Sequence, residues 1–126
     1  MESVLVLNSD PEFLIALEHV LEEEGFNTTT TWSMEEALAL LRCRPFNAVL
    51  VGEHQPEVKS EEILKALQSL GSIRCIVLQR STCDPAEAEH LLALGAYAVI
   101  PKQRVNEILE KLRQSLQNRR RASNAA

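Results

Sequence analysis

The sequence has few cysteines and no long apolar run. Cys43, Cys75 and Cys83 are an odd number, and none has the close paired spacing of a zinc site or a redox pair. No apolar run approaches the roughly 18 to 20 residues of a membrane span. The N-terminus has no basic region followed by a long apolar stretch, as a secretory signal would have. We therefore expect no disulfide, no membrane segment and a cytoplasmic protein.

Basic residues are also scarce relative to acidic ones. The 126 residues include 13 Lys and Arg against 18 Asp and Glu, which gives a net charge of -5. Three of the basic residues, Arg119, Arg120 and Arg121, lie in residues 118–126, where no acid occurs. This balance disfavours a domain whose main surface binds nucleic acid phosphates. We expect residues 1–117 to form one domain, and residues 118–126 to be a disordered basic tail or the start of a linker.

The remaining composition is that of an ordinary globular domain, with 45% apolar and 25% charged residues. Short apolar runs of strand type alternate with stretches in which apolar residues recur at helical spacing. The strand patterns are residues 4–7, 26–31, 47–51, 75–78 and 97–100, and the helix patterns are 11–24, 33–45, 60–70, 84–94 and 105–116. This alternation predicts an α/β protein whose parallel sheet is covered on both faces and joined by right-handed crossovers.

Several helix boundaries carry recognisable signals. Asp10 and Asp84 each precede a proline, and a carboxylate there accepts from free N–H groups while proline fits the first helical position. Ser33 and Glu36 have the spacing of a capping box. Gly25 follows the first helix and is expected to end it with a positive φ. Asp10 is therefore interpreted first as a helix cap.

The order of these patterns resembles the CheY-like receiver domain of two-component response regulators. The resemblance covers about residues 3–117 and includes Gly95 and Ala96 before the fifth strand and Lys102 just after it. It implies a flavodoxin-like, doubly wound (βα)5 three-layer sandwich with a parallel sheet of order 2-1-3-4-5. It also implies a site at the carboxyl ends of the strands.

The resemblance assigns each position of the family's phosphorylation site. Receivers transfer a phosphoryl group to an aspartate at the end of strand three, and an acidic pair after strand one holds a divalent metal. The acidic-pair positions are occupied here by Asn8 and Ser9, and the acceptor position by Gly52. Gln79 stands where the family has a Ser or Thr after strand four, while Lys102 matches the family lysine.

These replacements remove the chemistry of the site. Glycine has no side chain to phosphorylate, and Mg²⁺ prefers anionic oxygen ligands that an amide and a hydroxyl do not supply. No Gly-rich phosphate loop or nucleophile elbow is present elsewhere. We therefore expect no enzymatic activity, no cofactor and no Mg²⁺. We expect Lys102 to pair with a carboxylate, either Asp10 or Glu53.

The expected function is that of a degenerate receiver, a pseudo-receiver of two-component phosphorelay signalling that binds proteins independently of phosphorylation. Two alternatives stay open. One is a phospho-accepting receiver that uses a non-standard acid near the crevice, with Asp10, Glu53 and His54 as candidates. The other is a sensor of an anion or small molecule in the vacated crevice, with Gln79 and Arg80 as added donors.

The resemblance also implies where partners bind. In the family, the surface of helix four, strand five and helix five commonly makes dimers or partner contacts, and here it covers about residues 85–117. We expect a histidine kinase, an effector domain or another receiver as the partner, with a homodimer as an alternative. We expect neither a membrane nor a nucleic acid partner for this domain.

Overall fold

The computed structural model describes residues 2–52, 60–70, 73–79 and 84–124, in which strands and helices alternate as predicted. The strands are β1 Ser3–Leu7, β2 Asn27–Thr31, β3 Ala48–Gly52, β4 Arg74–Gln79 and β5 Ala98–Pro101. The helices are α1 Pro11–Glu23, α2 Met34–Cys43, α3 Ser60–Leu70, α4 Pro85–Ala93 and α5 Val105–Asn124.

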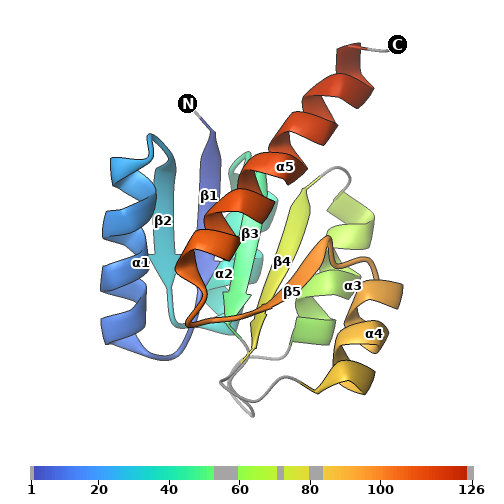
Figure 1. Cartoon of the computed structure of the whole chain (residues 1–126), viewed down its shortest axis with the longest axis horizontal. Helices are drawn as coiled ribbons and strands as arrows, with labels where there is room; N and C mark the ends of the chain where they lie inside the picture. Colours follow the sequence, from blue (N-terminus) through green and yellow to red (C-terminus); the bar gives the residue numbers. More distant parts are fainter. Residues whose placement is uncertain (1, 53–59, 71–72, 80–83, 125–126) are drawn as a thin grey trace.

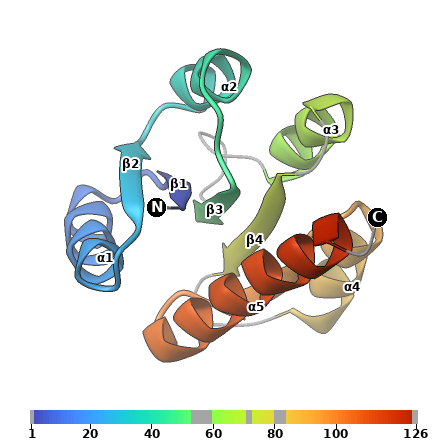
Figure 2. The same cartoon turned by 90° about the horizontal axis from the view of Figure 1, so that it is seen from above.

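The strands form one parallel sheet of order β2-β1-β3-β4-β5. Helices α1 and α5 cover one face of this sheet, and α2, α3 and α4 cover the other (Figures 1 and 2). This is the flavodoxin-like, doubly wound (βα)5 sandwich that the sequence predicts. All strands point the same way, so their carboxyl ends meet at one edge of the sheet.

The apolar runs of the sequence form two cores, one on each face. Because side chains alternate along a strand, Val4 and Val6 of β1 pack toward α1 and α5, whereas Leu5 and Leu7 pack toward α2 and α3. These four side chains are fully buried, as are those of the central strand β3. The prediction of strands buried on both faces is confirmed.

The predicted helix boundaries are largely confirmed. Asp10 accepts from backbone N–H groups in the first turn of α1, and Gly25 after that helix has a φ of +91°. The capping box is only half formed: Ser33 Oγ accepts from Glu36 N at 3.2 Å, but Ser33 N donates to Thr31 Oγ1 at 3.1 Å. The hydroxyl of Thr31 thus takes the role expected of the Glu36 carboxylate.

The last helix is longer than expected. The sequence predicts a helix over residues 105–116 and a disordered basic tail or the start of a linker over 118–126, whereas α5 continues to Asn124. No glycine or proline interrupts the chain after Val105, so the helical backbone has no local reason to stop. No helix within the described ranges is long and apolar enough to cross a membrane.

Candidate functional site

The carboxyl edge of the sheet brings together several positions singled out in the sequence. Asn8 directly follows β1, Gly52 ends β3, Gln79 ends β4 and Lys102 directly follows β5. These strand ends lie at the lower side of the molecule in Figure 1. Since Leu7 pairs with Val51 in the parallel register, the next residues of the two strands, Asn8 and Gly52, are neighbours.

The side chain of Asn8 occupies the space above Gly52. Asn8 is only 4% exposed. A Cβ added to Gly52 would overlap Asn8 Nδ2 and lie 2.8 Å from Asn8 Cγ, closer than real Cβ contacts come. The backbone of Gly52 does not have a positive φ. A side chain at position 52 would have to displace the Asn8 carboxamide, so glycine is favoured here by lack of space and not by backbone conformation.

Asn8 is held in this position from two sides. Its backbone N–H donates to the carbonyl of Thr31 at 3.1 Å, which ties the end of β1 to the end of β2. Its Oδ1 accepts from Asp10 N at 2.7 Å. Turning the carboxamide away from Gly52 would break the second bond and leave a polar group poorly paired at a buried position.

Asp10 and Lys102 form the charged part of the site. Asp10 Oδ1 accepts from Glu12 N at 3.1 Å as the cap of α1, and Asp10 Oδ2 lies 4.0 Å from Lys102 Nζ. Lys102 Nζ also lies 5.1 Å from the ring centroid of Phe13, within cation–π range. The expected pairing of Lys102 with a carboxylate is thus found with Asp10. Its other candidate partner, Glu53, lies outside the described residues.

The side chain of Gln79 lies on the sheet face covered by α2, α3 and α4, opposite to the face of Phe13 and Lys102. Cys75 and Val77 of β4 pack in the core under α2, α3 and α4, and by strand alternation Gln79 continues that side. It is 4% exposed, and its carbonyl accepts from Lys102 N at 2.8 Å. Gln79 and Lys102 are therefore joined through their backbones, while their side chains belong to opposite faces.

The expectation of a vacated crevice needs correction at the acceptor position. The alternative of an anion or small-molecule sensor assumed free space in the crevice, but the Asn8 carboxamide fills the space over Gly52. The reason is the register, because a residue at the end of β1 leans over its neighbour on β3. His54 and Arg80, named as further crevice residues, lie outside the described residues, and Ser9 is partly buried.

The residues present do not fit the divalent metal site of receivers. The Asn8 amide oxygen is engaged by Asp10 N, and the Asp10 carboxylate caps α1 and faces the Lys102 ammonium. Within the described part of the chain, no group of three His, Cys, Asp or Glu side chains could hold a metal ion. A hard cation at this place would find only the Asn8 amide, the Ser9 hydroxyl and the Asp10 carboxylate, and that carboxylate already binds the first turn of α1 and Lys102.

Two contributors were missed by the sequence analysis. Phe13 places its ring beside Lys102, and Thr31 accepts from Asn8 N and from Ser33 N. Phe13 follows the Asp10 cap by three residues, so the helix start does place it on the same side of the first turn. The role of Thr31 had no local signal, since it depends on the pairing of β1 with β2.

Comparison with solved structures identifies the fold. The structure matches a CheY-like receiver domain protein from Methanospirillum hungatei, with 23% identity over 97% of this chain and 98% of that one, at a TM-score of 0.87. It matches the receiver domain of a Francisella response regulator at 20% identity, 94% and 98% coverage and a TM-score of 0.85. The beryllofluoride-activated NtrC4 receiver domain dimer gives the same identity, coverage and TM-score.

At the level of sequence, no family model matches the chain and no curated protein is significantly similar to it. The identities to the solved structures are low, so the similarity shows the fold. The function has to be argued from the site.

Proposed function

We propose that this chain is a pseudo-receiver, a signalling module of two-component type that binds other proteins and is not phosphorylated on aspartate. The observation that carries the proposal is the packing of Asn8 into the space over Gly52. An acceptor aspartate at this position would need exactly the volume that the Asn8 carboxamide fills, so the site is adapted to having no acceptor. We also propose that the chain has no enzymatic activity and binds no Mg²⁺.

The chemistry of the neighbouring groups supports it. Phosphoryl transfer depends on an acceptor and on a cation that neutralises the developing charge. Here a carboxamide and a hydroxyl, of Asn8 and Ser9, replace the acids that would hold the cation. The one positive side chain described at the site, Lys102, is paired with Asp10.

The test is phosphorylation by a small acyl phosphate in the presence of Mg²⁺, followed by intact-protein mass spectrometry. We expect no adduct on the natural chain, while an active receiver treated in parallel is modified. The Gly52→Asp variant should also remain unmodified, because the acidic pair is missing and the new side chain collides with Asn8. A stoichiometric, hydroxylamine-labile adduct on the natural chain would overturn the proposal.

The same experiment decides the alternative of a non-standard acceptor. Asp10 is the candidate acid that the structure describes, and both of its oxygens are engaged, by the first turn of α1 and by Lys102. Peptide mapping of any adduct would show whether it lies on Asp10, Glu53 or His54. We favour the unmodified state because phosphorylating Asp10 would cost both the helix cap and the ion pair.

The partners we propose are a histidine kinase, an effector domain or another receiver, bound through the surface of α4, β5 and α5. Strand β5 is one edge of the sheet, and Leu92 on α4 is an apolar side chain that is 46% exposed. One solved structure of this fold is a receiver domain dimer, so a homodimer through this surface is part of the proposal. Loss of partner binding in a Leu92→Ser variant, with the fold intact, would support it.

A further inference from the structure

Two large apolar side chains are more exposed than any others in the described part of the chain. Ile15 on α1 is 71% exposed, and Trp32 after β2 is 70% exposed. Leu92 and Leu70 are the next, at 46% and 36%. Trp32 is the single tryptophan of the chain. Neither Ile15 nor Trp32 belongs to a core or to the site at the carboxyl edge, so neither is explained by the proposed function.

Ile15 lies on α1, which packs beside the edge strand β2, and Trp32 directly follows β2. Helix α1 packs beside β2, and Thr30 Oγ1 donates to Glu18 Oε2 at 3.3 Å, which fixes the helix against the strand. The two elements run in opposite directions, as in any parallel crossover. The two exposed apolar side chains therefore come from neighbouring elements at one edge of the sheet.

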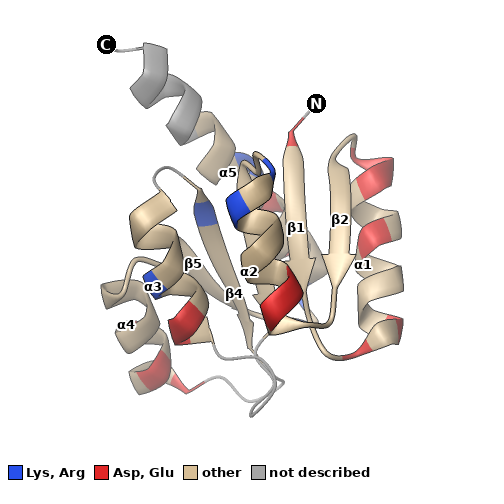
Figure 3. Ribbon diagram, turned by 180° about the vertical axis from the view of Figure 1, so that it is seen from behind, with Lys and Arg blue, Asp and Glu red and all other residues tan. Residues whose placement is uncertain are grey.

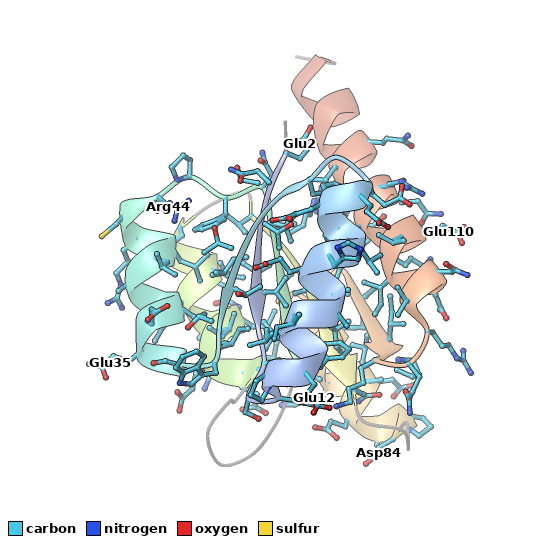
Figure 4. All side chains as sticks on the ribbon, turned by 90° about the vertical axis from the view of Figure 1, so that its left-hand side faces the viewer. Glu2, Glu12, Glu35, Arg44, Asp84 and Glu110 are labelled. Carbon is cyan, nitrogen blue, oxygen red and sulfur yellow. The ribbon has the colours of Figure 1, made fainter. Side chains whose placement is uncertain are left out.

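Acidic residues occur on the same two elements and at the start of the next helix. Glu12 and Glu18 flank Ile15 on α1, and Glu35 and Glu36 lie in the first turn of α2, soon after Trp32. Figure 4 shows Glu12 and Glu35 at the same end of the molecule, on either side of β2, and Figure 3 shows acidic positions on α1 and at the start of α2. The basic side chain of α2, Arg42, lies in its last turn, at the opposite end from Glu35 and Glu36. Arg44, just after α2, lies over the Phe46 ring and donates to Thr29 Oγ1.

An exposed tryptophan and isoleucine on elements that also carry several acids favour a particular kind of partner. Tryptophan is among the residues that contribute most to binding when it becomes buried in an interface. The carboxylates attract cationic groups and repel anionic ones. A second copy placed face to face would bring the same acids together, so the charge disfavours a symmetric dimer here.

We propose that the β2-edge surface, defined as Ile15, Trp32 and the carboxylates of Glu12, Glu18, Glu35 and Glu36, binds a protein segment that presents apolar side chains flanked by Lys or Arg. The apolar side chains of the partner cover Ile15 and Trp32, and its cations meet the carboxylates. Because β2 and β5 are opposite edges of the sheet, this surface is separate from the α4–β5–α5 surface. It does not depend on the proposed function, and the two surfaces can fail independently.

The single tryptophan gives a direct test. The probe is an amphipathic helical peptide of leucine and lysine, titrated against the full chain while the emission of Trp32 is recorded. We expect a saturable blue shift and protection from acrylamide quenching. The same peptide with glutamate in place of every lysine is expected to leave the emission unchanged. Equal effects of the two peptides would overturn the charge assignment.

Matched variants locate the binding. Ile15→Ser should weaken binding of the lysine peptide by about tenfold, which corresponds to roughly 1.4 kcal/mol, whereas Leu92→Ser on α4 should not change it. Glu18→Gln together with Glu35→Gln should reduce the salt dependence of binding, whereas Glu110→Gln on α5 should not. Circular dichroism checks that each variant is folded.

Two results would contradict the proposal. The first is equal binding by the Ile15→Ser and Leu92→Ser variants, which would place the peptide elsewhere on the acidic surface. The second is a blue shift of Trp32 that rises with protein concentration in the absence of peptide, because a second copy would then be the occupant. If the Leu92→Ser variant loses binding of the lysine peptide and the Ile15→Ser variant does not, the peptide binds the α4–β5–α5 surface, which contradicts the proposal for the β2-edge surface.

Discussion

At the scale of the residue, Asn8 and Gly52 have to be considered as a pair. Neither replacement is informative alone, because a glycine at a strand end and a buried asparagine are both common. Together they are complementary in volume: the carboxamide lies where the first carbon of any side chain at position 52 would be. The pair keeps the end of β3 closed and ties it to β1 and to the start of α1 through the Asn8–Asp10 hydrogen bond.

A double-mutant cycle tests this complementarity. Gly52→Ala should lower the free energy of unfolding by about 1–3 kcal/mol, because the added methyl group overpacks a buried position. Adding Asn8→Ala should make room, so the double variant should be more stable than the sum of the two single effects predicts, by about 0.5–3 kcal/mol. Urea denaturation of the four proteins gives the coupling. Strictly additive effects would mean that the two side chains do not compete for space.

The Lys102–Asp10 pair is expected to matter more for local conformation than for stability. The atoms are 4.0 Å apart, and the two side chains are 33% and 47% exposed, so screening by solvent is considerable. Lys102→Met should therefore cost well under about 1 kcal/mol. Amide NMR shifts should nevertheless change at Asp10 and in the first turn of α1. Lys65→Met, on the exposed side of α3, is the matched control. Shifts confined to the residues next to Lys102 in the sequence would contradict a link to α1.

At the scale of the element, the central strand β3 is expected to tolerate substitutions least. It pairs with β1 on one side and β4 on the other, and all five of its residues are buried. Strand β5, by contrast, is an edge strand, and it ends in Pro101, a residue that cannot donate to a further ladder. Position in the sheet thus decides which strand tolerates change.

Substitution of Val49→Asp should unfold the domain. Val49 is fully buried between its register partners Leu5 and Cys75. An unpaired charge at such a position costs several kcal/mol, compared with a total stability of about 5–15 kcal/mol for a domain. Far-ultraviolet circular dichroism and solubility give the answer. Ile15→Asp introduces the same charge at an exposed apolar position and should remain folded. A folded Val49→Asp variant would contradict the placement of β3.

At the scale of the whole molecule, the fold consists of one sheet between two helical layers, and each layer has its own core. Cys75 lies in the core under α2, α3 and α4 and is 2% exposed. Burial raises the pKa of its thiol from 9.0 to about 12, because the thiolate loses its hydration. The thiol is therefore a neutral core side chain at physiological pH.

This raised pKa predicts a loss of global stability in alkali. The folded state holds the proton more tightly than the unfolded state, so the contribution is complete below pH 9 and is lost as pH rises from 9 toward 12. At a pH one unit above the unfolded value, the loss should be roughly 1 kcal/mol. The stability of Cys75→Ala, measured by urea denaturation across this range, should fall less steeply. Parallel pH profiles for the two proteins would contradict a buried ionisable thiol.

The sequence by itself determined the elements and their order. Apolar runs of four or five residues, helical spacing and the Asp–Pro starts at Asp10 and Asp84 are local signals, and the alternation of strands and helices leaves few topologies that bury both sheet faces. That Asn8, Ser9 and Gly52 stand at the positions of the receiver acids was implied by the resemblance to receiver domains, because that family's chemistry needs specific side chains at specific strand ends.

Only the tertiary structure decided how those positions interact. The register of β1 on β3 places the Asn8 carboxamide over Gly52, and the packing of α1 against β2 brings Glu18 to Thr30. The structure also pairs Lys102 with Asp10, which the sequence left open between two acids. The spacing of residues along the chain shows which side chains share a face of one helix or strand. Contacts between strand ends depend instead on the strand register and on the crossover geometry, and no local sequence pattern encodes either.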